Sequence, residues 1–80
     1  MTAINELHQI IFFHRKQAQL SREELAELAG VGKTVIYDLE NGKKTVRWST
    51  ITTVLHALNI KIQFQSPLMD EYEKISNKNT

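Results

Sequence analysis

Cysteine is absent from this chain of 80 residues, which excludes disulfide bonds and thiolate metal sites. No apolar run approaches the roughly 18 residues needed to span a bilayer. Residues 1–9, MTAINELHQ, lack the basic segment that opens a secretory signal. We therefore expect a cytoplasmic protein without membrane contact. A charge excess is missing too, since ten basic and nine acidic residues leave a formal net charge of +1, so overall charge does not mark a nucleic-acid binder.

What the chain does contain is enough apolar residues for one small core. Hydrophobic residues make up 41% of the sequence, a share typical of a folded globular domain. Eighty residues are too few for two cores, so we expect a single domain. Its core will be thin, and pairing of two copies is a common way for such small domains to gain stability.

Apolar residues recur at helical spacing in four segments of the chain. The predicted helices cover residues 4–18, 21–29, 32–40 and 48–58. Leu7 and Ile11 belong to the repeating side of the first helix, and one of Phe12 and Phe13, just beyond that side, is expected to face solvent. This pattern predicts an all-α bundle.

Local signals mark both ends of the second helix. Ser21 and Glu24 have the spacing of a capping box, in which each side chain accepts a hydrogen bond from the other residue's backbone amide. Gly30 is expected to end the helix, because glycine takes a positive φ without strain. The predicted buried stripe between these ends consists of Leu25, Leu28 and Ala29. A short glycine turn then leads into the third helix.

The third predicted helix has two different sides. At 100° per residue, five polar residues fall within a sector of about 140°, and three aliphatic residues fall in a separate sector. The polar residues are Lys33, Thr34, Tyr37, Asp38 and Asn41, and the aliphatic ones are Val35, Ile36 and Leu39. A short helix with such a polar side is what contact with base edges in the DNA major groove requires. The alternative is a solvated helix face without a ligand.

The chemistry of these polar side chains suits base contacts. Lysine at position 33 can donate to O6 and N7 of guanine, and the methyl group of Thr34 can touch thymine. Asp38 can accept a hydrogen bond from N4 of cytosine. A carboxylate close to phosphates is repelled unless it is paired with a donor, so the alternative for Asp38 is an ion pair with a neighbouring cation.

Positive charge gathers directly after this helix. Lys43, Lys44 and Arg47 lie within residues 42–47, a stretch that contains no acid. Each such cation opposite a phosphate releases a counterion, so affinity for DNA should fall steeply with salt. The alternative is a charged loop that serves solubility alone.

Beyond Asn59, which is expected to end the fourth helix in the left-handed conformation, the period changes to two. Ile60, Ile62 and Phe64 alternate with polar residues, as in a strand. A lone strand leaves its backbone groups unpaired, so the predicted partner is the same strand of a second copy, across a homodimer axis. Residues 1–65 would then form the folded domain, and residues 66–80 a tail that is partly helical or disordered.

No constellation of residues points to catalysis or to a metal. His8 and His14 are six residues apart and so point about 240° apart on a helix. The sequence has no HExxH motif and no evident nucleophile–base pair. We expect no enzymatic activity, no cofactor and no metal.

Four short motifs follow one another in the middle of the chain. They are LSREELA at residues 20–26, Gly30-Val31, Ile36, and LENG at residues 39–42. In this combination they resemble the Xre/Cro family of helix-turn-helix DNA-binding domains, to which lambdoid phage repressors belong. The match covers about residues 11–60. It implies a lambda-repressor-like bundle of four to five helices whose third helix enters the major groove.

The resemblance also implies roles for individual residues. Base contacts are implied for Lys33, Thr34 and Asp38, with Tyr37 beside them. Phosphate contacts are implied for Arg22, Asn41, Lys43 and Lys44, to which the charge pattern adds Arg47. Arg15 and Glu40 match positions that form a structural ion pair between the first and third helices.

The predicted terminal strand narrows the resemblance. A helix-turn-helix domain followed at once by such a strand is similar to HipB-type antitoxins, which dimerise through these strands, bind operator DNA and hold a HipA-type kinase toxin. Phe12 and Phe13 stand where the family commonly has charged residues, and Trp48 where it has an aliphatic core residue. These three are the candidate partner surface, with core packing as the alternative for Trp48.

The resemblance therefore implies a bacterial or phage repressor that acts on the nucleoid. It would bind a roughly palindromic operator as a homodimer and, as the antitoxin of a HipA-type operon, repress that operon. Two alternatives stay open. One is a stand-alone phage-type repressor, and the other is a protein-interaction module without DNA binding, which the near-neutral charge and Asp38 favour.

Overall fold

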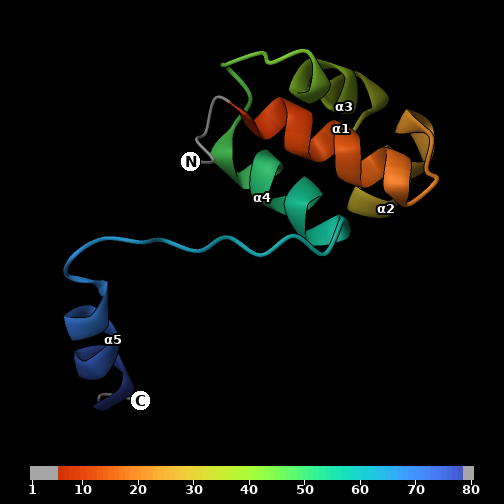
Figure 1. Cartoon of the computed structure of the whole chain (residues 1–80). Helices are drawn as coiled ribbons and strands as arrows, with labels where there is room; N and C mark the ends of the chain where they lie inside the picture. Colours follow the sequence, from red (N-terminus) through yellow and green to blue (C-terminus); the bar gives the residue numbers. More distant parts are fainter. Residues whose placement is uncertain (1–5, 79–80) are drawn as a thin grey trace.

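Five helices make up the part of the chain described by the computed structural model, residues 6–78 (Figure 1). They are α1 (Leu7–Gln17), α2 (Arg22–Ala29), α3 (Lys33–Glu40), α4 (Trp48–Ala57) and α5 (Met69–Lys78). The first four helices pack together, whereas α5 lies apart at the end of an extended segment (Figure 1). The predicted all-α bundle is confirmed. The predicted start of the first helix at Ile4 lies outside the described residues.

The capping box at the start of α2 is formed as predicted. The amide of Glu24 donates to Oγ of Ser21 at 3.0 Å, and the amide of Ser21 donates to Oε1 of Glu24 at 2.8 Å. In contrast, α3 begins at Gly32 without a side-chain cap. Its start therefore depends on backbone hydrogen bonds, such as that from the amide of Val35 to the carbonyl of Gly32 at 3.0 Å, and on the packing of its aliphatic side.

Each helix of the bundle is followed, within two residues, by one residue in the left-handed conformation. These residues are Gln19, Gly30, Gly42 and Asn59, with φ of 59°, 73°, 78° and 59°. After each helix, two backbone amides donate hydrogen bonds to carbonyls of its last turn, as in a Schellman motif. After α4, the amide of Ile60 donates to the carbonyl of Leu55 at 2.9 Å. The predicted stops at Gly30 and Asn59 are confirmed, whereas glutamine carries no signal for this conformation.

The left-handed backbone of Gln19 gives a first testable prediction. A residue with a Cβ pays about 1 kcal/mol or more for this conformation, and glycine does not. We expect Gln19→Gly to raise the free energy of unfolding by roughly 0.5–1 kcal/mol in urea and thermal denaturation. The control is Gln17→Gly, at the last residue of α1, which should lower it by up to about 1 kcal/mol. A loss of stability in both variants would contradict the prediction.

The core lies between α1, α2, α3 and α4. It consists of seven buried aliphatic residues, which are Ile11, Leu25, Ala26, Ile36, Leu39, Val54 and Leu55. The prediction that Leu28 is buried is wrong, because its side chain is 61% exposed. Helix α2 packs against both α3 and α4, and this double contact buries Ala26 and turns Leu28 outward.

The segment after α4 is extended and crosses to α5 without joining a sheet (Figure 1). Within residues 6–78 there is no strand, and no backbone hydrogen bond is found for residues 61–65. A strand requires a second strand to bond with, so the predicted strand is not formed by a single chain, and its pairing across a homodimer stays a prediction. Ile60 packs against the core, which leaves Ile62 and Phe64 exposed.

The tail beyond this segment is helical. Of the two alternatives for residues 66–80, the structure contains the helix, α5, through Lys78. Tyr72 and Ile75 are exposed on it, and so is Leu68, the residue directly before it. Among the described residues, no helix combines the length and the apolar character needed to cross a membrane.

Candidate nucleic-acid interface

The outward side of α3 carries the polar residues that the helical period places together. Lys33, Thr34, Tyr37 and Asn41 are exposed, and Asp38 is half-buried. On the opposite side, Ile36 and Leu39 are buried, and Val35 packs against the same core. The predicted division of α3 into a core side and a polar side is confirmed. Whether the polar side contacts bases stays a prediction.

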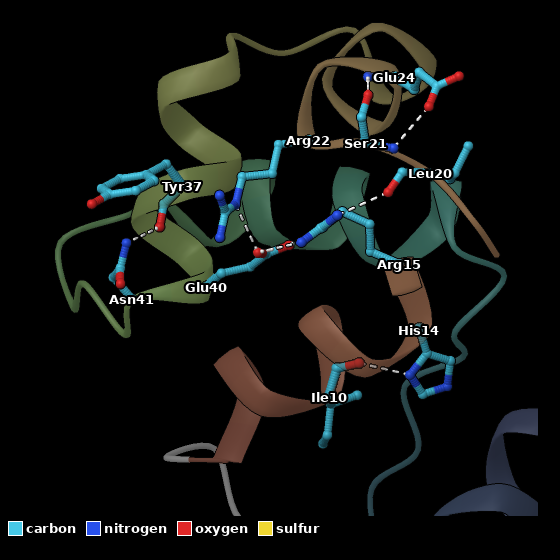
Figure 2. Close-up of polar contacts among 10 residues, drawn as sticks. All are labelled: Ile10, His14, Arg15, Leu20, Ser21, Arg22, Glu24, Tyr37, Glu40 and Asn41. Carbon is cyan, nitrogen blue, oxygen red and sulfur yellow. Dashed lines mark hydrogen bonds and ion pairs between the residues drawn. The ribbon is translucent and has the colours of Figure 1, made fainter. Parts of the chain in front are cut away.

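Glu40, the last residue of α3, lies between two arginines (Figure 2). Arg15 donates to its carboxylate twice, from Nε at 2.5 Å and from Nη2 at 3.0 Å, and Nε of Arg22 donates to it at 3.0 Å. Arg15 also donates from Nη1 to the carbonyl of Leu20 at 2.8 Å. The side chains of Arg15 and Glu40 are only 7% and 2% exposed. The implied structural ion pair is present, and it ties α3 to both α1 and α2.

This network fixes the guanidinium of Arg22 at the start of α2. Its Cζ lies 5.4 Å from the centroid of the Tyr37 ring, which is within cation–π range. Figure 2 shows Arg22 between Tyr37 and Glu40. Within residues 6–78 its two Nη groups form no hydrogen bond. An oriented planar cation with free donors is suited to bidentate recognition of a phosphate.

Two further cations of the predicted interface are held by carboxylates. Nζ of Lys33 lies 2.9 Å from Oε1 of Glu23, and Nζ of Lys43 lies 3.5 Å from Oδ2 of Asp38. The ion pair that was the alternative for Asp38 is therefore present. The pairing of Lys33 with Glu23 joins two helices across the turn, and the spacing of ten residues gave no signal for it.

The ion pair with Lys33 gives a second testable prediction. The hydrogen bond from Lys33, and then its charge, lower the pKa of the Glu23 carboxyl below its ordinary value of 4.5. A pKa lowered by folding adds stability above the unfolded pKa, which is lost as pH falls through the folded pKa. We expect NMR titration to show this lowered pKa and to show it rising towards 4.5 in Lys33→Gln. It should stay low in Lys44→Gln, and an unchanged pKa in Lys33→Gln would contradict the assignment.

The loop after α3 holds most of the remaining candidates. Nδ2 of Asn41 donates to the carbonyl of Tyr37 at 2.8 Å, which fixes that amide at the end of the helix. Lys44 is exposed, and so is Arg47, the N-cap residue of α4. Neither forms an ion pair within the described residues. Both are thus available to phosphates.

A shallow hollow lies between α2 and α3. It is lined by Arg22, Lys33, Thr34 and Tyr37. Three predicted base-contacting residues and one predicted phosphate-contacting residue therefore converge on one concave patch, formed by two helices that the sequence separates by a turn.

The three residues of the candidate partner surface are all exposed. Both Phe12 and Phe13 face solvent, where the sequence predicted exposure for one of them. Cζ of Arg15 lies 5.4 Å from the centroid of the Phe12 ring. Trp48 is exposed as well, so core packing, the alternative for it, is wrong. Trp48 is the first residue of α4, and it precedes by about one turn Ile51, the first residue of that helix that packs against the core.

One histidine, His14, forms a hydrogen bond within its own helix. Nδ1 of His14 lies 2.7 Å from the carbonyl of Ile10, one turn earlier in α1 (Figure 2). Within residues 6–78, no three side chains of histidine, cysteine, aspartate or glutamate gather closely enough to hold a metal ion.

Comparison with known proteins places this geometry in a family. The helix-turn-helix family model matches residues 14–65. The "Uncharacterized HTH-type transcriptional regulator y4mF" of Sinorhizobium fredii (strain NBRC 101917 / NGR234) is 42% identical over 53 residues, which cover 66% of this chain and 70% of that protein.

Solved structures share the fold. The chain is similar to one in the structure of a HipA-HipB-O2-O3 complex, with a TM-score of 0.74, 19% identity, and coverage of 84% of this chain and 94% of that one. A HipB-O4 20mer complex gives a TM-score of 0.73 with the same identity and coverage. At this level of identity, the likeness is one of fold.

Proposed function

The chain belongs to the helix-turn-helix family, and from this premise we propose that it is a sequence-specific DNA-binding transcriptional regulator that acts as a repressor. The observation that carries the proposal is the outward side of α3, where Lys33, Thr34 and Tyr37 are exposed beside the fixed guanidinium of Arg22. In this arrangement, α3 enters the major groove with its polar side towards the base edges. Phosphates of the adjacent backbone then meet Arg22 and the loop after α3.

The second part of the proposal is that two copies bind one operator. Ile62 and Phe64 are exposed on a segment without a backbone partner in its own chain, and pairing of two such segments would satisfy their backbone groups and cover both side chains. A two-fold dimer places its two α3 helices about 34 Å apart, one turn of B-DNA. The operator should accordingly be roughly palindromic.

The third part is that the regulator is an antitoxin that represses its own operon together with a HipA-type kinase toxin. The shared fold with a chain of a HipA-HipB-O2-O3 complex supports it. Phe12, Phe13 and Trp48 are exposed and would supply apolar contacts to such a partner. A stand-alone regulator is the second candidate, favoured by the likeness to the S. fredii regulator. Co-purification of a kinase-like protein from the native host would support the antitoxin role, and its absence would support the stand-alone one.

The proposal includes no enzymatic role, and it places the protein in the cytoplasm, on the DNA. The charged residues of the α2–α3 surface are accounted for by capping, by ion pairing, or by their exposure towards phosphates.

Selection of bound duplexes from a random pool tests the proposal directly. We expect enrichment of one motif with two-fold symmetry and half-sites about 10 base pairs apart. Its binding should weaken steeply as salt is raised. A protein-interaction module without DNA binding would enrich no motif, and that result would overturn the proposed function.

A further inference from the structure

Glu23 makes only a small contribution to the stability of the fold, through its place in the first turn of α2 and an exposed ion pair. Of the two acids in the first turn of α2, Glu24 completes the capping box. Glu23 instead extends to Lys33 on the next helix, where the two side chains are 71% and 62% exposed. Ion pairs between such exposed side chains contribute little to stability. The position of Glu23, on the surface that the proposed function turns towards DNA, calls for a different explanation.

Several cations of this surface are paired with carboxylates of the protein itself. Five cations were predicted to contact DNA, namely Arg22, Lys33, Lys43, Lys44 and Arg47. Three of them are paired with a carboxylate, Arg22 with Glu40, Lys33 with Glu23, and Lys43 with Asp38. Because Glu40 is also the partner of Arg15, the group of six cations and three carboxylates carries a net charge of +3. Since binding to DNA of any sequence is driven by cation–phosphate contacts, this pairing lowers non-specific affinity.

The ion pair with Glu23 nevertheless leaves Lys33 able to donate hydrogen bonds to a base. A lysine ammonium has three N–H donors, and Glu23 takes one of them. Two remain, which is the number that O6 and N7 of a guanine accept. A phosphate that approaches Lys33 is repelled by the neighbouring carboxylate, whereas the uncharged edge of a guanine is not.

We propose that Glu23 is a positioning residue for sequence discrimination, which acts through Lys33 by orienting its ammonium towards a base edge and weakening its attraction to phosphates. This inference rests on the proposed function. Asp38 forms a second such pair with Lys43, at the longer distance of 3.5 Å.

The test compares the operator obtained by selection with a scrambled duplex of equal length and composition. Dissociation constants for both are measured over a range of salt concentrations, for the full chain and for Glu23→Gln, which keeps a hydrogen-bond acceptor and removes the charge. We expect affinity for the scrambled duplex to rise roughly three- to tenfold, because one more uncompensated cation is then available to a phosphate. Its salt slope should steepen by about 0.9. Affinity for the operator should change less, so the ratio of the two affinities should fall.

Two controls separate this role from a general effect of charge. Glu27→Gln removes the same charge from the same helix, at a residue that forms no ion pair within the described residues, and it should leave the ratio unchanged. In a Lys33→Gln background, Glu23→Gln should also leave the ratio unchanged, because a residue that acts through Lys33 is coupled to it in a double-mutant cycle. Thermal melts check that every variant is folded.

The outcomes distinguish this inference from the proposed function. If the unmodified chain prefers no sequence, the proposed function fails, and this inference fails with it. The role of Glu23 is overturned, and the proposed function stands, in two cases. In the first, the unmodified chain is specific but Glu23→Gln leaves the ratio of operator to scrambled-duplex affinity unchanged. In the second, Glu23→Gln lowers this ratio by the same factor in the Lys33→Gln background.

Discussion

Replacement of Glu40 by alanine is expected to lower the free energy of unfolding by about 3–5 kcal/mol, because it removes one partner of a buried ion pair. Arg15 would keep its charge at a side chain only 7% exposed, with the carbonyl of Leu20 as its remaining acceptor. Small domains have total stabilities of roughly 5–15 kcal/mol, so the variant should be partly unfolded at room temperature. Urea denaturation followed by circular dichroism measures this loss.

Matched variants show whether the lost ion pair is the cause. Glu27→Ala removes an exposed acid of α2 and should change stability by no more than about 0.5 kcal/mol. The double variant Arg15→Met/Glu40→Leu removes both charges, and it should recover much of the stability, because apolar replacement of a whole buried pair is often neutral. A loss below about 1 kcal/mol in Glu40→Ala would contradict the structural role. A loss of DNA binding in Glu40→Ala does not make Glu40 a recognition residue, because the variant is destabilised and its Arg22 is no longer held in place.

Replacement of both Lys43 and Lys44 by alanine is expected to weaken operator binding roughly 10- to 100-fold and to reduce the salt slope by about 1.8, the share of two phosphate contacts. The loss at position 43 has two parts. One contact disappears, and Asp38 loses the cation that lies 3.5 Å from its carboxylate, so an unpaired negative charge faces the DNA. Titration of the selected operator at several salt concentrations measures both quantities.

The control for this pair of lysines changes net charge equally. Lys61 and Lys74 are exposed in the segment after α4 and in α5, away from α3, and their joint replacement by alanine should leave the slope as it is. A slope that does not change in the Lys43→Ala/Lys44→Ala variant would remove these residues from the interface. A slope that falls equally in both double variants would show a general effect of charge.

Most of the helix ends could be predicted from residues close to them in the sequence. Ser21 and Glu24 formed the predicted capping box, and Gly30 and Asn59 took the predicted left-handed conformation. These features involve residues within a few positions of each other, so their geometry is contained in the backbone of a single turn. Gln19 took the same conformation without a sequence signal, because the end of α1 is set by its packing and by hydrogen bonds at residues 15–20.

The helical period alone could not predict which side of α2 is buried. Leu25, Leu28 and Ala29 span about 100° of the helix, and so do Leu25, Ala26 and Ala29. The sequence pattern alone does not distinguish the two sectors. Contacts of α2 with α3 and α4 decide between them, and they leave Leu28 exposed.

The alternating pattern of residues 60–65 also failed to predict the structure of the single chain, for a different reason. Its pattern predicts a strand, yet the backbone bonds of a strand belong to two chains or two segments at once. Residues 6–78 of one chain hold no second strand, so the pattern stays an extended segment with Ile62 and Phe64 exposed.

The sequence by itself determined the four helices of the bundle, the capping box of α2, the stops at Gly30 and Asn59, and the two sides of α3, because each depends on positions within one or two turns. Apart from the pair of Arg15 with Glu40, which the family resemblance implied, only the tertiary structure decided which charges meet. Glu40 is shared by Arg15 and Arg22, which are 25 and 18 residues away, and Glu23 meets Lys33 across a turn of ten residues. Such pairings depend on how the helices cross, and the crossing is set by the packing of the whole core. The net charge that the protein presents to DNA is therefore a property of the fold.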